Sequence, residues 1–309
     1  LGEEFIPRYI PEDVDVEQAI FIKGVSYPFT IRNASKWVDV GVFSEISQGR
    51  GTEHRGVFMS LAHLDDRTIE QDACVPFEHL LKSGLDLRTD AVEFAPAVQH
   101  FNGGARIDLA GRTCIAGLLA AGENAGGQHG ADRPGGNALA DSQVFGRRAG
   151  EAAAEVGGAG DAEFVRSFAE AGLAALQPAE GGEDVDAVIG EMAWEMWKGA
   201  TVVRTADSLA QATSAAEAAS ERLKGASGSR RRLAEARNMA LLGRCVALPA
   251  SMREESRGTH YRADCDVVND PQWQRQIELR LEGGEIAAEV QPLIELSGEL
   301  TGLEKKLEG

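Results

Sequence analysis

Cysteine is scarce in this sequence, and its four cysteines lie far apart, at Cys74, Cys114, Cys245 and Cys265. Because no two of them have the C-x-x-C spacing, a zinc or iron–sulfur site built by this chain alone is not expected. Sparse, unpaired cysteines are typical of proteins in a reducing compartment. We therefore expect a cytoplasmic location, with any attachment to a membrane made through partner subunits.

Long apolar runs are also missing. No stretch of about 18 apolar residues occurs, so no membrane span is expected. The chain begins Leu1-Gly2-Glu3-Glu4-Phe5, without a methionine and without a signal peptide. These residues look like the interior of a longer protein, and we expect the chain to be part of one.

Basic residues are outnumbered, since 31 Lys and Arg stand against 49 Asp and Glu, and the formal net charge is −18. The mean surface potential should repel nucleic acid and anionic lipid, so neither is expected as a partner. A small anionic substrate would need a local basic pocket. The 309 residues are enough for about two domains, and the hydrophobic content of 43% permits a sizeable core.

The N-terminal third mixes short helical and extended segments. Residues 38–46 predict a helix with one apolar face, which Gly49 and Gly51 end. Residues 57–61 have the composition of a strand.

The pattern from about residue 160 onward is helical. Alanine-rich segments at 206–224 and 229–248 predict two helices with a Gly/Ser turn between them. Helices joined by short loops favour an antiparallel bundle. Two further helices are predicted by apolar stripes, which consist of Phe164, Val165, Phe168 and Leu173, and of Val185, Val188, Ile189, Met192 and Met196.

The central segment combines an apolar run with a glycine-rich loop. Cys114–Ala121 predicts a buried, parallel strand. Six glycines follow between Gly122 and Gly136, and Asn137 is then expected to cap a helix that ends near Glu155. The face of this helix that we expect to be apolar carries Leu139, Phe145 and Ala149, with Ser142 between them.

This strand, loop and helix together suit an anionic or electron-rich ligand. Glycines let backbone N–H groups approach a ligand closely, and the N-terminus of the following helix carries partial positive charge. Glu123, at the end of the predicted strand, suits a sugar or ribityl hydroxyl. The alternative interpretation is that the glycines form only a turn.

Three segments, in this order, resemble the succinate dehydrogenase, fumarate reductase and L-aspartate oxidase flavoproteins. Residues 117–150 contain Gly117-Leu118-Leu119-Ala120-Ala121-Gly122-Glu123 and His129-Gly130-Ala131-Asp132-Arg133-Pro134-Gly135-Gly136-Asn137, and look like the second FAD-binding signature of that family. Residues 96–108, around His100-Phe101-Asn102-Gly103-Gly104, and residues 253–264, around Glu255-Ser256-Arg257-Gly258-Thr259-His260, are similar to two further family motifs. The resemblance covers nearly the whole chain.

The resemblance implies FAD as the cofactor. Glu123 matches the acid that holds FAD hydroxyls, and a helix N-terminus beside the flavin would stabilise negative charge on its reduced form. The implied cofactor-binding residues are Gly122, Glu123, His129, Arg133, Gly136, Asn137, Ala138 and Leu139.

His100 and Arg133 match the catalytic residues that bind the substrate carboxylate, and we call this pair the carboxylate clamp. A guanidinium binds a carboxylate through two parallel hydrogen bonds, and an imidazole adds a donor. Asn102 is a further candidate substrate contact, because its amide can donate a hydrogen bond. From the residues alone, His100 could instead be a turn or core residue, and Arg133 could brace its loop. Glu255, Arg257, His260 and Arg262 are expected to tie the helical domain to the flavin domain by charged hydrogen bonds.

The expected fold class is α/β plus all-α. Residues 1–95 would be the remainder of a capping domain, and residues 96–158 the C-terminal part of a Rossmann-like FAD-binding domain. Residues 159–255 would form the helical bundle, and residues 256–309 a tail packed on the flavoprotein.

The implied activity is that of an FAD-dependent oxidoreductase that transfers hydride between flavin N5 and a small carboxylate substrate. The fingerprint G-x-G-x-x-G occurs nowhere in the chain. We therefore expect an N-terminal flavoprotein half as partner, either a separate chain or a cleaved fragment. An iron–sulfur electron-transfer subunit is a further implied partner. The alternatives are amine oxidation of the L-aspartate oxidase kind, and a non-catalytic half that only completes a partner's fold.

Overall fold

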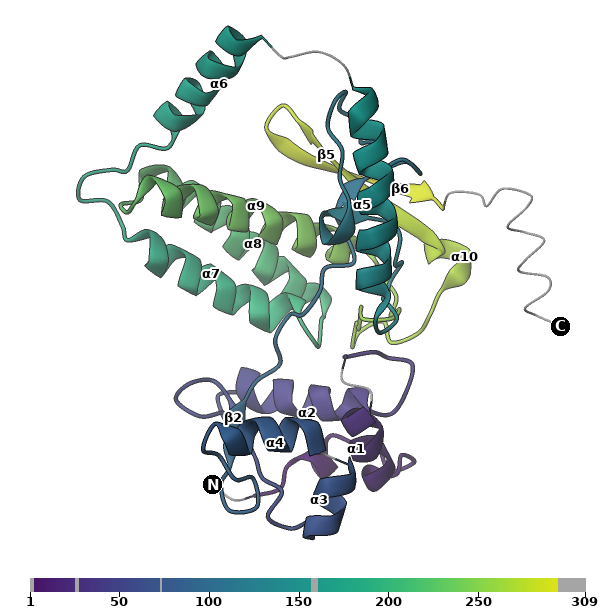
Figure 1. The fold of residues 1–309 in the computed structure, drawn as a ribbon. Helices are drawn as coiled ribbons and strands as arrows, with labels where there is room; N and C mark the ends of the chain where they lie inside the picture. Colours follow the sequence, from purple (N-terminus) through teal and green to yellow (C-terminus); the bar gives the residue numbers. More distant parts are fainter. Residues whose placement is uncertain (1–2, 26–27, 73, 157–160, 294–309) are drawn as a thin grey trace, which may run out of the picture.

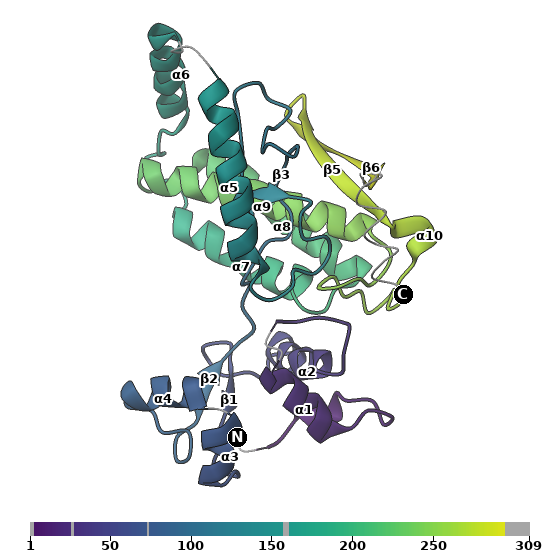
Figure 2. The ribbon, with the colours of Figure 1, turned by 45° about the vertical axis from the view of Figure 1, so that its right-hand side comes forward.

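The structure is a computed structural model that describes residues 3–25, 28–72, 74–156 and 161–293. It consists of two lobes that are joined by the segment following β2 (Figures 1 and 2). The N-terminal lobe contains η1 (Ile6–Arg8), α1 (Val16–Val25), α2 (Lys36–Ser47), β1 (Val57–Met59), α3 (Asp66–Asp72), α4 (Cys74–Lys82) and β2 (Val92–Phe94).

The second lobe holds the rest of the chain. Its elements are β3 (Ala105–Arg106), η2 (Gly122–Asn124), β4 (Ala125–Gly126), α5 (Asn137–Glu155), α6 (Ala162–Ala175), α7 (Val185–Ala200), α8 (Ala206–Arg222), η3 (Leu223–Gly225), α9 (Arg230–Met252), α10 (Asp270–Trp273), β5 (Arg275–Glu282) and β6 (Glu285–Pro292). None of the described helices combines the length and the apolar content that a membrane crossing requires.

Helix α2 confirms the helix predicted at residues 38–46, and it packs where the two lobes meet (Figure 1). Val42 and Ile46 are buried beside Val57 of β1, with Trp194 and Trp197 of α7 against them. The predicted strand at 57–61 is also present, though shorter, as β1, which pairs antiparallel with β2. Burying apolar side chains from both lobes in one cluster favours a defined placement of the lobes.

Helices α7, α8 and α9 form the predicted bundle. The stripe that begins at Val185 faces its centre, and Val188, Leu209 and Leu233 are fully buried there. Buried alanines on α8 and α9 let the helix backbones approach closely. Thr205 closes a capping box at the start of α8, where its hydroxyl accepts from the Ser208 N–H.

Helix α6 was predicted as a helix, which is confirmed, but its expected place in the bundle is wrong. Phe164, Val165, Phe168 and Leu173 are exposed within the part of the chain that the structure describes. The helix stands away from α7–α9 in both ribbon views (Figures 1 and 2). The spacing of apolar residues determines a helix but not its packing partner, and the bundle core is made from α7, α8 and α9.

The buried parallel strand predicted at Cys114–Ala121 is wrong. The segment reverses direction at Gly117, whose φ is +81°, and residues Arg112 and Leu119 form an isolated antiparallel bridge. Ile115 and Leu118 are exposed. A buried parallel strand needs neighbours on both sides, and beside this segment the described parallel pairing is the short β3–β4 pair.

Helix α5 runs over the predicted residues, but its predicted cap is wrong. Gly136, with a φ of +80°, occupies the N-cap position, and no side chain caps the helix. The predicted apolar face is also not buried, since Leu139 is 75% exposed. Ala149 and Ser142 lie instead beside Gly111 and Gly122 of the preceding loop.

The tail contains a β-hairpin that the sequence analysis did not predict. Strands β5 and β6 pair in register from Arg275↔Pro292 to Glu282↔Glu285. Gly283 and Gly284 connect them with φ of +60° and +92°, the left-handed backbone that a two-residue hairpin turn requires. Residues 294–309 of the predicted tail lie outside the described residues.

Candidate functional site

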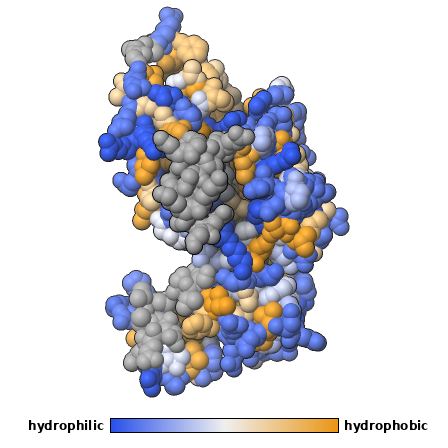
Figure 3. Space-filling view, turned by 90° about the vertical axis from the view of Figure 1, so that its right-hand side faces the viewer, coloured by the Kyte–Doolittle hydropathy of each residue, from blue (hydrophilic) through white to orange (hydrophobic). Residues whose placement is uncertain are grey.

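A groove of about 3060 Å³ runs between the lobes and contains the residues of the predicted clamp. His100, Asn102, Glu123 and Arg133 line it, together with residues of the N-terminal lobe and of the C-terminal segment. Figure 3 shows the outline indented where the lobes meet, with exposed apolar atoms on both sides. Small-molecule sites usually have volumes of about 300–1,000 Å³, so the groove has room for more than a small carboxylate.

The segment that joins the lobes brings His100 to this groove. Its start is held by Trp197, whose Nε1–H donates to the Pro96 carbonyl oxygen at 2.9 Å. Its end is held by Glu123, whose Oε1 accepts from the Phe101 N–H at 2.9 Å. The second carboxylate oxygen of Glu123 lies 3.5 Å from Nδ1 of His100. Glu123 therefore positions the backbone and the ring of the clamp histidine.

A second histidine and an aspartate lie next to the clamp histidine. The rings of His100 and His129 meet edge to face, with centroids 5.5 Å apart. His129 Nε2 is 3.8 Å from Asp141 Oδ2 of α5, and both side chains are almost completely buried. The order Glu123, His100, His129, Asp141 alternates carboxylates and imidazoles through the interior of the loop region.

Arg133 is a cation without a neutralising partner. Its Nη1 donates to the Pro134 carbonyl at 3.1 Å, its Nε is buried without a partner, and no carboxylate of the described residues forms an ion pair with it. Asn102 also has a buried amide oxygen without a partner. Because both line the groove, their unused hydrogen-bonding groups are available to a ligand there.

Unpaired buried polar atoms concentrate in this region. Among the described residues eight side-chain atoms are buried without a hydrogen bond, and the one outside this region is Trp273 Nε1. Folded proteins rarely leave such atoms unsatisfied, so each requires an explanation. The others belong to His100, Asn102, Gln128, His129, Arg133 and Asp141.

The predicted cofactor residues divide into two groups. Glu123 and Arg133 line the groove, whereas Gly136, Asn137, Ala138 and Leu139 lie at the start of α5 and outside its lining. Gly122 and His129 are also outside the lining; Gly122 lies against Ser142 of α5. The structure thus brings His100, Glu123 and His129 together, and places the first turn of α5 on a separate surface.

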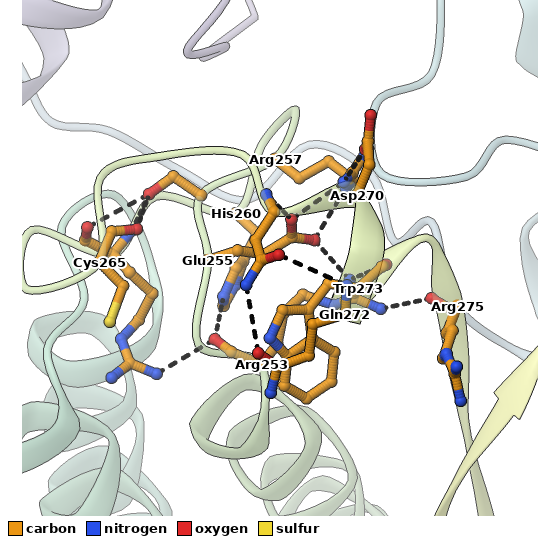
Figure 4. Close-up of polar contacts among 12 residues, drawn as sticks. Arg253, Glu255, Arg257, His260, Cys265, Asp270, Gln272, Trp273 and Arg275 are labelled. Carbon is orange, nitrogen blue, oxygen red and sulfur yellow. Dashed lines mark hydrogen bonds and ion pairs between the residues drawn. The ribbon is translucent and has the colours of Figure 1, made fainter.

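The charged cluster at 253–264 has a different role from the one predicted. Glu255 is completely buried and accepts hydrogen bonds from Arg253, Arg257 and the Asn269 N–H (Figure 4). Arg253 also donates to the carbonyls of Trp273 and Arg275, so the cluster ties α9 to the C-terminal hairpin. The link to the flavin-binding loop is made instead by an uncharged residue, Thr259.

The ionisation of Glu255 and His260 follows from their surroundings. Burial raises the pKa of Glu255, but hydrogen bonds from Arg257, the Asn269 N–H and Arg253 outweigh it and hold the pKa below its ordinary value. Burial, with the neighbouring Arg204, lowers the pKa of His260 to about 3. His260 is therefore neutral at physiological pH, and its Nδ1 accepts from Arg204 while Nε2–H donates to the Arg253 carbonyl.

Sequence reasoning missed several residues of this region. Gln128 has both amide atoms buried without a partner, Asp141 pairs with His129, and Asp132 contacts the N-terminal lobe. These contacts join residues far apart in sequence, which no periodicity could reveal. For Gln128 the one available signal was its place in the glycine-rich loop.

Two protein-family profiles match the chain. The profile described as "FAD binding domain" matches residues 39–139, and the one described as "Fumarate reductase flavoprotein C-term" matches residues 190–295.

Individual relatives give the same result. A subunit of the fumarate reductase (CoM/CoB) of Methanothermobacter marburgensis is 38% identical over 295 residues, which cover 90% of this chain and 49% of the relative. The L-aspartate oxidase of Streptomyces coelicolor is 32% identical over 223 residues, covering 64% of this chain and 36% of the enzyme. A solved structure of Mycobacterium smegmatis Sdh1 in complex with UQ1 matches with a TM-score of 0.74 and 27% identity, covering 89% of this chain and 50% of that one. The chain spans at most about half the length of these relatives.

Proposed function

Because the chain belongs to the succinate dehydrogenase, fumarate reductase and L-aspartate oxidase flavoprotein family, we propose that it supplies the carboxylate-binding side of an FAD-dependent oxidoreductase site. FAD, when bound, would exchange a hydride at N5 with a carbon atom next to the substrate carboxylate. The observation that carries the proposal is Arg133: an unneutralised guanidinium, with a buried and unpaired Nε, on the wall of the groove.

The residues of this chain fit FAD in two ways. The carboxylate of Glu123 has lone pairs left for a hydroxyl after accepting from the Phe101 N–H. The first turn of α5, Asn137–Leu139, has no side-chain cap, so its N–H groups can face an electron-rich ring edge. Gln128 and His129 add buried polar atoms without partners in the same loop.

The clamp would bind and orient the substrate. Arg133 would grip the carboxylate through two hydrogen bonds and polarise the bond next to it. His100 Nε2, buried and without a partner, would bind the same group. The N-terminal lobe would close the groove and exclude water, which strengthens these contacts.

We propose the domain division that follows from this role. Residues 1–95 are the capping part, 96–158 belong to the FAD-binding domain, 159–255 to the helical domain, and 256–309 to a tail packed on the flavoprotein. The hairpin β5–β6, held to α9 through Arg253 and Glu255, supports the last assignment. The proposed partners are an N-terminal flavoprotein half and an iron–sulfur subunit; the M. marburgensis relative is itself named as one subunit of its enzyme.

Amine oxidation is the second candidate, supported by the similarity to an L-aspartate oxidase. The same clamp would bind the amino-acid carboxylate. Turnover of the holoenzyme with succinate or fumarate, compared with L-aspartate, separates the two reactions. A complex that binds flavin but turns over none of these substrates would favour a non-catalytic assembly role.

The isolated chain is expected to bind FAD poorly, because its sequence lacks the phosphate-binding fingerprint. Titration of FAD fluorescence should show no saturation at micromolar protein. Adding an N-terminal flavoprotein half that contains G-x-G-x-x-G should restore binding, and turnover is then assayed on that complex. Micromolar or tighter binding by the chain alone would contradict this prediction.

Glu123→Ala is expected to lose flavin from the reconstituted complex on dialysis. Each charge-assisted hydrogen bond removed is worth roughly 1.5–3 kcal/mol. Glu123→Gln is the matched variant, because its amide oxygen can still accept from the Phe101 N–H while the charge is lost. Flavin absorbance after dialysis measures the outcome; full retention in the alanine variant would leave Glu123 with only the role of positioning His100.

Asn102→Ala is expected to lower kcat/KM more than it lowers stability. The buried amide oxygen has no partner in the protein to lose, so removing it should cost little in folding. If melting temperature falls while kcat/KM is unchanged, Asn102 only shapes the turn before Gly103-Gly104.

A further inference from the structure

Three segments distant in sequence meet directly before Arg133. The Asp132 carboxylate accepts from the Thr30 hydroxyl at 2.8 Å and forms an ion pair with Arg32 at 3.3 Å. The carbonyl of Ala131 accepts from both the N–H and the hydroxyl of Thr259, at 3.0 and 3.1 Å. We call this meeting point of residues 30–32, 131–132 and 258–259 the three-segment junction.

The first and third segments also bind one another, so the junction is closed. The Ile31 N–H donates to the Gly258 carbonyl at 3.0 Å. Gly258 has a φ of +60°, and a Cβ at this position would lie 2.4 Å from the Ala131 carbonyl oxygen. Only glycine therefore permits this approach of the C-terminal segment to the loop.

The loop that carries Arg133 needs such an anchor. Gly127, Gly130 and Gly136 all have positive φ, and glycine has more backbone freedom to lose than any other residue. Arg133 itself is held by a single hydrogen bond, to the carbonyl of the next residue. Nothing in its own contacts fixes the direction of its guanidinium relative to the groove.

Within the junction, Thr30 matters more than Arg32. Thr30 is buried and Asp132 is 12% exposed, whereas Arg32 is 65% exposed. Exposed ion pairs contribute little, but a buried carboxylate that loses its hydrogen-bond donor keeps an uncompensated desolvation cost. Because Thr30 belongs to the N-terminal lobe, the strongest side-chain bond of Asp132 crosses between the lobes.

We propose that Asp132 is a positioning residue that couples the placement of the N-terminal lobe to the direction of Arg133. When the lobe is in place, Thr30 holds Asp132, and the adjacent guanidinium is aimed at the carboxylate subsite. When the lobe moves away, the glycine-rich loop loses this anchor and the clamp loosens. The inference deepens the proposed function and rests on it for the role of Arg133.

The test combines variants of both partners with two readouts. Asp132→Ala and Thr30→Val remove the bond from either side, and Asp132→Asn keeps an amide oxygen that can accept from Thr30. Thr89→Val is the matched control, because the Thr89 hydroxyl bonds within the N-terminal lobe, to the Asp86 carbonyl. Hydrogen exchange of residues 127–136 is measured in the 309-residue chain, and kcat, KM for fumarate and flavin content in the reconstituted holoenzyme.

We expect Asp132→Ala to speed exchange in residues 127–136 and to lower kcat/KM by about 10- to 100-fold, mainly through KM, with flavin content unchanged. Small misplacements of a binding group cause losses of this size. Thr30→Val should act in the same direction, the double variant should be no worse than Asp132→Ala, and Asp132→Asn should stay within about threefold of the wild type.

Three results would overturn the proposal: unchanged exchange in Asp132→Ala, faster exchange with unchanged KM, or losses that simply multiply in the double variant. An effect of Thr89→Val equal to that of Thr30→Val would also count against it. A wild-type holoenzyme that turns over no carboxylate substrate contradicts the proposed function instead, and the exchange rates still decide whether Asp132 anchors the loop.

Discussion

Arg133→Lys is expected to lower kcat/KM by more than about 30-fold, which corresponds to about 2 kcal/mol, with flavin content unchanged. Lysine keeps the positive charge but loses the planar fork that fixes the orientation of a carboxylate. The mean field of a chain with a net charge of −18 opposes an anionic substrate, so the local cation must do more of the binding. Steady-state kinetics of the reconstituted holoenzyme measure the loss.

The matched control is Arg112→Lys, an arginine that pairs with Glu155 on the surface and should change little. His100→Ala should cost less than Arg133→Lys. Combining the two should cost less than the sum of the single losses, because both hold one group. Near-wild-type efficiency of Arg133→Lys, with flavin fully bound, would remove Arg133 from the substrate site.

Glu255→Ala should lower the free energy of unfolding by about 3–5 kcal/mol, the cost of leaving buried charges without their partner. Glu255 is completely buried and bonds to two arginines and one backbone N–H, so its removal strands Arg253 and Arg257. Urea unfolding of the chain measures the change. Glu235→Ala, at an exposed pair on α9, is the control and should cost at most about 1 kcal/mol.

The same residue predicts a pH dependence. Its folded-state pKa is lowered, so its contribution to stability is present above the ordinary carboxyl pKa of about 4.3 and is lost as the pH falls through the folded-state value. Glu255→Gln should therefore lose stability at neutral pH and approach the wild type in acid. Parallel stability curves from pH 7 down to pH 3 would show that Glu255 carries no such linkage.

Local signals in the sequence predicted the helices well. The stripe from Val185 to Met196 and the alanine-rich segments that follow describe faces that bury one another, so periodicity alone located α7, α8 and α9. Helix α5 was found because two glycines precede it, although the left-handed Gly136, and not Asn137, occupies its cap position. The family assignment from three ordered motifs is confirmed by the comparisons.

Features that depend on distant partners were not predictable in this way. The apolar run Cys114–Ala121 has the composition of a buried strand, but a parallel strand exists only with neighbours, and the segment turns back on itself. The contact of Glu123 with the Phe101 N–H and the pairing of His129 with Asp141 join residues with no periodic relation. The functional roles of the clamp residues stay predictions, which the kinetic experiments address.

The aromatic cluster at the lobe boundary makes the protein its own optical probe. Trp194 and Trp197 stack with centroids 5.2 Å apart and planes 10° from parallel, a geometry that couples their electronic transitions. Trp37 lies in the neighbouring cluster, so three of the four tryptophans of the chain are at the boundary. Near-ultraviolet circular dichroism and the emission maximum therefore report on this boundary without a label, and titrating substrate while recording them follows lobe movement in solution.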